Sequence, residues 1–228
     1  MINTVIFDFD GTLSSEREYI YGCFKYVEKE IEQKFGILNA YEKLKQLFNE
    51  SWNDTFGRLL IQEKVKYDEQ DIKELVEIYR QAPPVMKLYE DTKPTLQMLK
   101  HKGIKTAVLT NGFYQIQKEK IKNSGLEEFF NAIEIPDLYG REFWKPDARR
   151  VNELLKTLGS APEEVLYIGD SNSDYKMAQA AGTQVAFIKR EDCVNEFHFE
   201  DEVSYVMKSL LELETIICNS NELKIERR

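Results

Sequence analysis

The sequence is poor in the features that define membrane, secreted and disulfide-stabilised proteins. Its longest apolar runs are far shorter than the roughly 20 residues that a membrane-spanning helix needs, so no transmembrane helix is expected. Only three cysteines occur in 228 residues, and their odd number and wide spacing favour reduced thiols over a disulfide framework. Residues 1–4 lead directly into an apolar segment, without the basic region or cleavage site of a signal peptide. We therefore expect a cytoplasmic protein that does not bind membranes.

Positive charge is also in short supply. The chain has 31 Lys and Arg against 40 Asp and Glu, which gives a formal net charge of −9. This balance argues against binding to nucleic acid or to an anionic membrane through the general field of the protein. It does not exclude an anionic substrate, because one bound cation and one lysine can reverse the sign of the potential inside a pocket. A glycine-rich dinucleotide fingerprint is missing, so no nicotinamide or flavin is expected, and His101 and His198 lie in polar stretches typical of the surface.

What the sequence does contain is an alternation of strand and helix patterns. Short apolar runs rich in β-branched residues, each followed by a turn signal, predict buried parallel strands. We expect them at residues 5–9, 105–109, 132–135, 165–168 and 185–188, with a weaker one near 205–206. Helical patterns between the later strands, with right-handed crossovers, predict an α/β fold with a doubly wound parallel sheet. The polar residues beyond Ile217 are expected to fray.

Between the first two strands lies a long block with only helical periodicity. Apolar residues recur at three- and four-residue spacing within residues 20–35, 41–48, 52–61 and 72–79. Pro83-Pro84 ends the block, because a proline disfavours helical geometry in the residue before it. We therefore predict a helical domain at residues 15–86, inserted into an α/β core that consists of residues 1–14 and 87–228.

The strongest functional signal comes at the end of the first strand. Asp8 and Asp10 follow its apolar run, and the alternation of side chains along a strand places both on the same side. Two carboxylates so close would raise each other's pKa unless a cation shares them, and Mg²⁺ prefers oxygen ligands. Gly11 then lets the chain turn sharply beside a ligand. The pair favours half of a Mg²⁺ site, with a simple Asp-rich turn as the alternative.

Further polar clusters follow the later strands or the connections after them. Thr110-Asn111-Gly112 ends the second strand, Lys145 comes just before a helix, and Asp170 and Asp174 follow the fourth strand. In doubly wound sheets, ligands bind beyond the carboxyl ends of the strands. Taken alone, each cluster has a simpler explanation as a turn, a solvated lysine or a helix N-cap. Their joint occurrence at strand ends favours a single catalytic site.

With these motifs in this order, the sequence resembles the haloacid dehalogenase-like hydrolase superfamily, in the branch with a helical cap inserted after the first motif. The resemblance extends along the chain to about Leu213. It implies a Rossmann-like catalytic core, with residues 15–86 as the cap. One segment departs from many relatives, because Ser14-Ser15-Glu16 stands where they carry a further Asp or an aromatic residue. The hinge at this point is therefore not defined by the resemblance.

The resemblance implies a role for each motif residue. Asp8 would attack phosphorus as the nucleophile, and Asp10 would protonate the leaving oxygen and later deprotonate the attacking water. Mg²⁺ would be bound by Asp8, by Asp170 and by the backbone carbonyl of Asp10. Asp174 would either anchor water on the metal or orient the lysine. The transferring phosphoryl group would be bound by the Thr110 hydroxyl, the Asn111 backbone N–H and the Lys145 ammonium.

Several reactions are compatible with such a site. Asp10 favours phosphoryl transfer, because a dehalogenase expels halide and needs no acid at this position. We therefore expect a Mg²⁺-dependent phosphatase that acts on a small phosphorylated metabolite, such as a sugar, nucleotide or organic-acid phosphate. A sugar phosphomutase is the alternative, followed by a 2-haloacid dehalogenase and by a non-catalytic binding protein on the same fold. The protein is expected to be a monomer or a homodimer.

Specificity is expected to come from the cap, which would close over the site and exclude water. The candidate substrate contacts in this segment are Tyr19, Trp52, Phe56 and Arg58. Aromatic side chains among them could stack on a nucleobase or a sugar. The helical spacing of Trp52 and Phe56 fits equally well with a role in the packed core of the cap.

Overall fold

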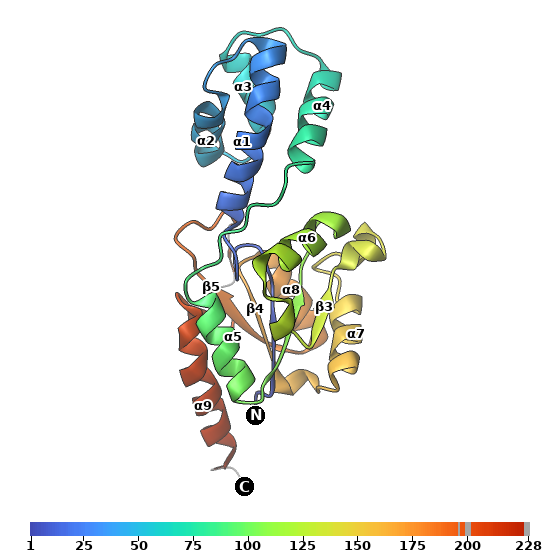
Figure 1. Cartoon of the computed structure of the whole chain (residues 1–228). Coiled ribbons are helices and arrows are strands. Elements are labelled where there is room, and N and C mark those ends of the chain that lie inside the picture. Colours follow the sequence, from blue (N-terminus) through green and yellow to red (C-terminus); the bar gives the residue numbers. More distant parts are fainter. Residues whose placement is uncertain (196, 199–201, 226–228) are drawn as a thin grey trace. The chain divides into compact units, whose positions relative to one another are not determined.

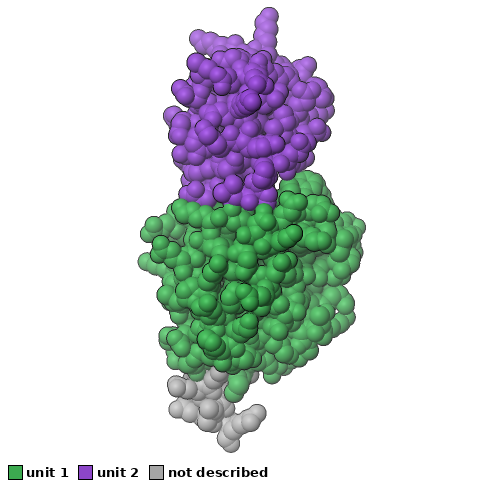
Figure 2. Space-filling view, in the orientation of Figure 1, with its two compact units in different colours: residues 1–16, 86–228 green, residues 17–85 purple. Residues whose placement is uncertain are grey.

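The computed structural model describes residues 1–195, 197–198 and 202–225. The chain divides into two compact units, one made of residues 1–16 and 86–228 and the other of residues 17–85 (Figure 2). In the described part of the chain, no helix has both the length and the apolar character to cross a membrane.

The first unit contains a six-stranded parallel sheet with the strand order β3-β2-β1-β4-β5-β6 (Figure 1). Its strands are β1 (Thr4–Phe7), β2 (Lys105–Leu109), β3 (Ala132–Glu134), β4 (Val165–Gly169), β5 (Gln184–Ile188) and β6 (Tyr205–Met207). The order reverses at β1, which pairs with β2 on one side and with β4 on the other. The predicted doubly wound α/β fold is thus confirmed, including the weak last strand. In folds of this kind, ligands bind beyond the carboxyl ends of the strands at such a reversal.

Helices cover both faces of this sheet, because its strands are apolar on both sides. Val5 and Phe7 face a core that includes residues of α5 (Thr92–His101), α6 (Tyr114–Ser124) and α9 (Leu213–Ile225). Ile6 points the other way, into a core shared with α7 (Arg149–Leu158) and α8 (Asn172–Ala181). All three β1 side chains are fully buried. This packing fixes β1, and with it the carboxylates that follow, in the centre of the sheet.

The end of the chain differs from the expectation that residues beyond Ile217 fray. Instead, α9 continues to Ile225. Leu213 and Ile217, four residues apart, are both buried in the core of the first unit. These two side chains anchor the first turns of the helix in the core.

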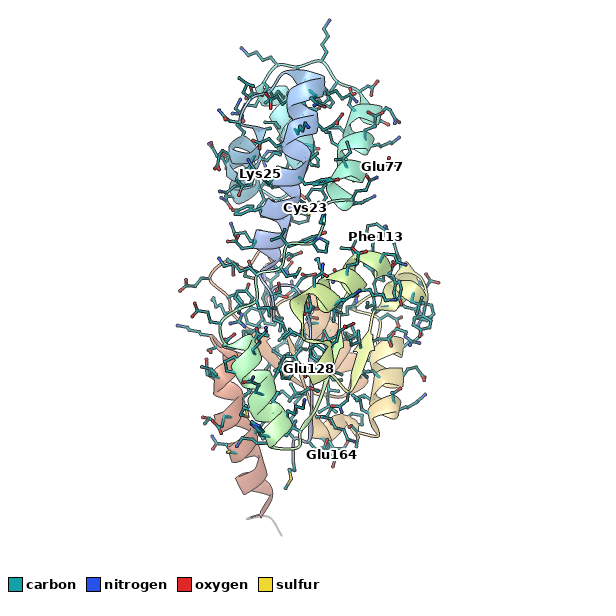
Figure 3. All side chains as sticks on the ribbon, viewed as in Figure 1. Cys23, Lys25, Glu77, Phe113, Glu128 and Glu164 are labelled. Atoms are coloured by element: carbon teal, nitrogen blue, oxygen red, sulfur yellow. The ribbon has the colours of Figure 1, made fainter. Side chains whose placement is uncertain are left out.

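The second unit is a bundle of α1 (Glu16–Phe35, whose first residue belongs to the first unit), α2 (Ala40–Glu50), α3 (Thr55–Gln62) and α4 (Glu69–Arg80). Its centre is aromatic: the Phe24 ring lies 5.9 Å from Phe48, 6.1 Å from Phe56 and 5.9 Å from Tyr79. Cys23 on α1 is also buried, which supports packing rather than chemistry for this thiol (Figure 3). Phe56 thus lies in the core of this unit, which is one of the two roles that its helical spacing allowed.

A buried ion pair in the first unit fastens the loop that follows β1. The Arg190 guanidinium lies 2.7 and 2.9 Å from the two carboxylate oxygens of Asp91, and it also donates to the Thr12 carbonyl at 2.7 Å. Asp91 in turn accepts from the Leu210 N–H at 2.8 Å. Burial opposes ionisation of Asp91, but the bonds from Arg190 and from the Leu210 amide outweigh it and lower the pKa of this carboxyl.

We expect Arg190→Met to lower the free energy of unfolding by about 3–5 kcal/mol, because it leaves the buried Asp91 charge without a countercharge. The matched control is Arg149→Met, whose ion pair with Asp147 is exposed, with an expected loss below about 1 kcal/mol. Urea denaturation measures both. Since the pKa of Asp91 is lowered by folding, the wild-type contribution is present at neutral pH and is lost as the pH falls through that pKa. Equal losses of unfolding free energy in the two variants would contradict the stabilising role of the Arg190–Asp91 pair.

Candidate active site

The loop after β1 folds back on itself and brings its acids against the end of β4. The Gly11 N–H donates to the Ser14 carbonyl at 2.8 Å, and the Leu13 N–H donates to the Phe9 carbonyl at 2.9 Å. Gly11 has a φ of 74°, and a Cβ at this position would lie 2.0 Å from the Asp170 Oδ2. Only glycine permits both this backbone conformation and the close approach of the Asp170 carboxylate.

Lys145 lies between two carboxylates from different strand ends. Its Nζ is 2.7 Å from Asp8 Oδ1 and 2.7 Å from Asp174 Oδ1, and its side chain is only 3% exposed. Asn111 fixes the backbone of Lys145: the Asn111 side chain donates to the Lys145 carbonyl at 3.2 Å and accepts from its N–H at 2.9 Å. The end of β2 and the segment before α7 are thereby held together beside the nucleophile predicted from the sequence.

Negative charge exceeds positive charge in this buried cluster. Burial raises the pKa of Asp8 well above its usual value against the charge of Lys145, and the nearby Asp174 and Asp170 add to the rise. Burial and the Asp174 charge raise the pKa of Asp170 to about 7. For Lys145, burial alone would favour the neutral form, but Asp174 and Asp8 outweigh it and raise its pKa. Keeping so many buried acids ionised is costly without a further cation.

The acids form a set of oxygen donors that fits a hard divalent cation. Oxygens of Asp8, Asp170 and Asp174 all lie within 4.8 Å of one another. Asp170 is fully buried; its Oδ2 accepts from Asn195 Nδ2 at 3.0 Å, while its Oδ1 has no hydrogen-bond partner among the described residues. A buried carboxylate oxygen without a donor is what an ion would satisfy. An all-oxygen set matches Mg²⁺ rather than zinc or copper.

Asp174 is more heavily engaged by protein donors than the other two acids. Its Oδ1 accepts from Lys145 at 2.7 Å and from the Tyr167 hydroxyl at 2.9 Å. Its Oδ2 accepts from the Ser171 N–H at 3.1 Å, and the Ser171 hydroxyl caps α8 in return. The sequence allowed two interpretations of this segment, a helix N-cap and a group that orients the lysine. The two are compatible, because Asp174 completes a helix cap and also orients Lys145.

Asp10 is held by two side chains of α6 that sequence reasoning did not single out. Gln117 Nε2 donates to Asp10 Oδ2 at 2.9 Å and to the Thr110 hydroxyl oxygen at 2.6 Å. Lys120 Nζ lies 2.8 Å from the same Asp10 oxygen. Gln117 and Lys120 are both almost fully buried. Their spacing of three residues places them on one face of the helix, the face that also buries Ile121.

Glu16 is a further acid that the sequence reasoning did not include in the site. Burial and the charge of Asp10 raise its pKa to about 7, and the charge of Lys120 opposes this rise. Glu16 occupies part of the segment in which the sequence departs from many relatives. The departure from the relatives was the signal that could have indicated this position, but it did not indicate a role for the Glu16 carboxylate.

The candidate substrate contacts of the helical unit have different surroundings. Phe56 is buried, with its ring 6.0 Å from Tyr79, and Tyr19 is also buried. Trp52 is 67% exposed. Arg58 donates to the Leu47 and Ser51 carbonyls at 2.9 and 2.8 Å, where it closes the end of α2. A role in substrate binding stays a prediction for all four.

Buried acids and two buried lysines thus gather at the switch point of the doubly wound sheet, where such folds bind their ligands. A family model for haloacid dehalogenase-like hydrolases matches residues 5–188. The pyrophosphatase PpaX of Bacillus cereus (strain AH820) is 32% identical over 193 residues, covering 82% of this chain and 83% of that protein. The chain therefore belongs to the haloacid dehalogenase-like hydrolase family, as the motifs predicted, and it is an enzyme of this hydrolase class.

Solved structures agree with the fold. A HAD family hydrolase from Deinococcus radiodurans R1, with bound phosphate and sodium, superposes with a TM-score of 0.73 at 21% identity and covers 96% of each chain. YfnB from Bacillus subtilis, described as a HAD-hydrolase bound to magnesium that reveals interdomain movement, has a TM-score of 0.73 at 21% identity. That match covers 94% of this chain and 98% of YfnB. At these identities the two structures support the fold alone.

Proposed function

We propose that the protein is a Mg²⁺-dependent phosphatase that hydrolyses a small phosphomonoester, such as a sugar, nucleotide or organic-acid phosphate, through an aspartyl-phosphate on Asp8. The observation that carries this proposal is that the two carboxylates at the end of β1 are paired with different lysines. Asp8 is paired with Lys145 at 2.7 Å, whereas Asp10 is paired with Lys120 at 2.8 Å. One acid is thus suited to attack phosphorus and the other to transfer a proton. An acid in the second position has no use in the expulsion of halide.

The residues around Asp8 supply what a phosphoryl group requires. Lys145 provides a fixed positive charge, and the Thr110 hydroxyl and the Asn111 backbone N–H follow at the adjacent strand end. In the first step Asp8 displaces the alcohol, which takes a proton from Asp10. In the second step water, deprotonated by Asp10, releases phosphate from Asp8. Splitting one displacement into two gives each step a positioned nucleophile and a positioned proton carrier.

The donor set described above would hold Mg²⁺ through Asp8 and Asp170, with the Asp10 backbone carbonyl as a further ligand. Asp174 would act mainly by orienting Lys145, since both of its oxygens already accept hydrogen bonds within the protein. When bound, the ion supplies charge neutralisation that lets an anionic nucleophile approach a phosphate. The magnesium in the YfnB structure accords with this choice of ion.

The helical unit, residues 17–85, would serve as the cap that excludes water and selects the substrate, and this assignment includes Tyr19, Trp52, Phe56 and Arg58. The interdomain movement described for YfnB supports a cap that opens and closes. The described residues show no disulfide at Cys23, Cys193 or Cys218, which supports a reducing, cytoplasmic location. We propose a small phosphorylated metabolite as the partner of the site, and a monomer or homodimer as its assembly.

Removal of Mg²⁺ tests the proposal directly. We expect purified protein to hydrolyse 4-nitrophenyl phosphate with Mg²⁺, and EDTA to reduce kcat by at least about 100-fold, because the ion contributes several kcal/mol of charge stabilisation. Re-addition of Mg²⁺ restores the rate. Full activity in EDTA would overturn the metal assignment, and no hydrolysis of any member of a phosphometabolite panel would overturn the phosphatase. Isomerisation of a hexose phosphate without free phosphate would instead indicate a mutase.

A further inference from the structure

Among the described residues, the side-chain donors to the Asp10 carboxylate all bind one of its two oxygens. Lys120 Nζ and Gln117 Nε2 both bind its Oδ2, at 2.8 and 2.9 Å. Two donors on one oxygen fix the rotation of the carboxylate about its last side-chain bond. The other oxygen, Oδ1, is buried and has no hydrogen-bond partner in the described part of the chain. Because buried carboxylate oxygens are normally satisfied, this oxygen is arranged for a partner that arrives with the substrate.

We infer that Gln117 and Lys120 are positioning residues that present Asp10 Oδ1 to the leaving-group oxygen. The inference rests on the proposed phosphatase, and it adds to it the side chains that make Asp10 an effective proton carrier. General acid catalysis depends on geometry first, since the acid must lie within hydrogen-bond reach of the oxygen that it protonates. A carboxylate free to rotate would present either oxygen, in many orientations.

Gln117 also prepares the neighbouring phosphate-binding hydroxyl. Its amide nitrogen has two hydrogens, and it contacts both Asp10 Oδ2 and Thr110 Oγ1. The Thr110 oxygen acts as the acceptor in this bond, so its own proton is left to donate. Within the described residues that proton reaches only the Asn111 carbonyl, at a long 3.3 Å. One amide thereby orients Asp10, the proton donor for the leaving group, and the Thr110 hydroxyl, a hydrogen-bond donor for the phosphoryl group.

The backbone is shaped to admit this side chain. Gly112 has a φ of 128°, and a Cβ there would lie 2.9 Å from Gln117 Cγ and 3.0 Å from its Cδ. Glycine in the second motif thus makes room for the amide that connects Thr110 with Asp10. A purely structural ion pair explains the arrangement less well, because a buried pair adds little net stability and would not leave Asp10 Oδ1 unsatisfied.

The test compares two esters that differ in how much they need a proton. Phenyl phosphate has a poor leaving group that requires protonation, whereas 2,4-dinitrophenyl phosphate releases a stable anion. For Lys120→Met we expect kcat/KM to fall about 10- to 100-fold for phenyl phosphate and less than about threefold for the dinitrophenyl ester. The matched control is Lys118→Met, an exposed lysine on the same helix, with both values unchanged. Gln117→Leu, which keeps the Lys120–Asp10 pair, should show the same leaving-group selectivity.

A double-variant cycle separates positioning from a general effect on the fold. In an Asp10→Asn background, Lys120→Met is expected to change kcat/KM for either ester by less than about twofold, because the group through which it acts is gone. Equal losses on both esters, or no loss, in Lys120→Met and Gln117→Leu would overturn the positioning role while the phosphatase stands. If the wild type hydrolyses neither ester and no member of the phosphometabolite panel, the proposed function is overturned and the positioning role with it.

Discussion

Asp8→Asn is expected to abolish ester hydrolysis, with a loss in kcat of at least about 10⁴-fold. The amide has nearly the shape of the carboxylate but neither its charge nor its nucleophilicity. Asp174 is not expected to replace it, because its Oδ1 is engaged by Lys145 and Tyr167, at 2.7 and 2.9 Å. Steady-state hydrolysis of 4-nitrophenyl phosphate measures the effect, and Glu153→Gln, which removes an exposed charge on α7, is the matched control with unchanged activity.

The same substitution should not weaken the fold of the metal-free protein. Burial raises the pKa of Asp8, which means that its ionised form is less favourable in the folded than in the unfolded chain. Neutral asparagine avoids that cost at pH 7. We expect the free energy of unfolding of the variant in EDTA to be no lower than that of wild type.

Trapping of the proposed aspartyl-phosphate is a second measurement. Wild-type protein that is quenched with acid during turnover should retain bound phosphate that hydroxylamine releases, and the variant should not. Activity near the wild-type level in Asp8→Asn would remove the nucleophile from the proposal.

The positions of the acids could be predicted from the sequence because a parallel sheet converts chain order into geometry. Strands β1, β2 and β4 are adjacent and in parallel register, so the polar residues that follow each of them meet at one edge. Asp8, Thr110 and Asp170 needed no further information to be placed near each other. The pairing of Lys145 with Asp8 did not follow in the same way, since Lys145 lies far from any strand end in the sequence and is brought in by Asn111.

Gln117 and Lys120 could not be found by the same reasoning. They lie in an 11-residue helix that contains lysines at 118, 120 and 122, and polarity alone makes these three equivalent. The buried positions of α6 are 117, 120, 121 and 124, which is the spacing of one helix face. Ile121 anchors that face in the core. The presence of polar residues on the same face as Ile121 was the signal that could have identified Gln117 and Lys120 as buried site residues.

In the helical unit, the sequence did not predict correctly where one helix begins. Trp52 and Phe56 share a face only if one helix contains both. Asp54 instead caps α3, accepting from the Gly57 N–H at 3.3 Å, so the helix begins at Thr55. Phe56 then enters the aromatic core and Trp52 stays outside it. The prediction of a helix over residues 52–61 was wrong at its start for this reason.

Lys145→Met is expected to reduce both stability and activity. The ammonium of Lys145 is the positive charge that faces both Asp8 and Asp174, and its removal leaves buried carboxylates uncompensated. In EDTA at pH 8 we expect the free energy of unfolding to fall by about 3–5 kcal/mol. We also expect kcat with Mg²⁺ to fall by about 10²- to 10³-fold, the usual effect of losing one preorganised donor to a transition state. Urea denaturation and steady-state kinetics measure the two effects.

The pH dependence of this loss distinguishes charge from packing. Without the ammonium, the pKa of Asp8 in the folded variant is raised further above that of the unfolded chain, so the folded state binds more protons. Its stability therefore rises as the pH falls, and the difference from wild type should be smaller at pH 5 than at pH 8. Adding Asp174→Asn, which removes one of the two paired carboxylates, should restore part of the stability but none of the activity. A loss that is the same at both pH values and is unaffected by Asp174→Asn would mean that Lys145 fills space rather than balancing charge.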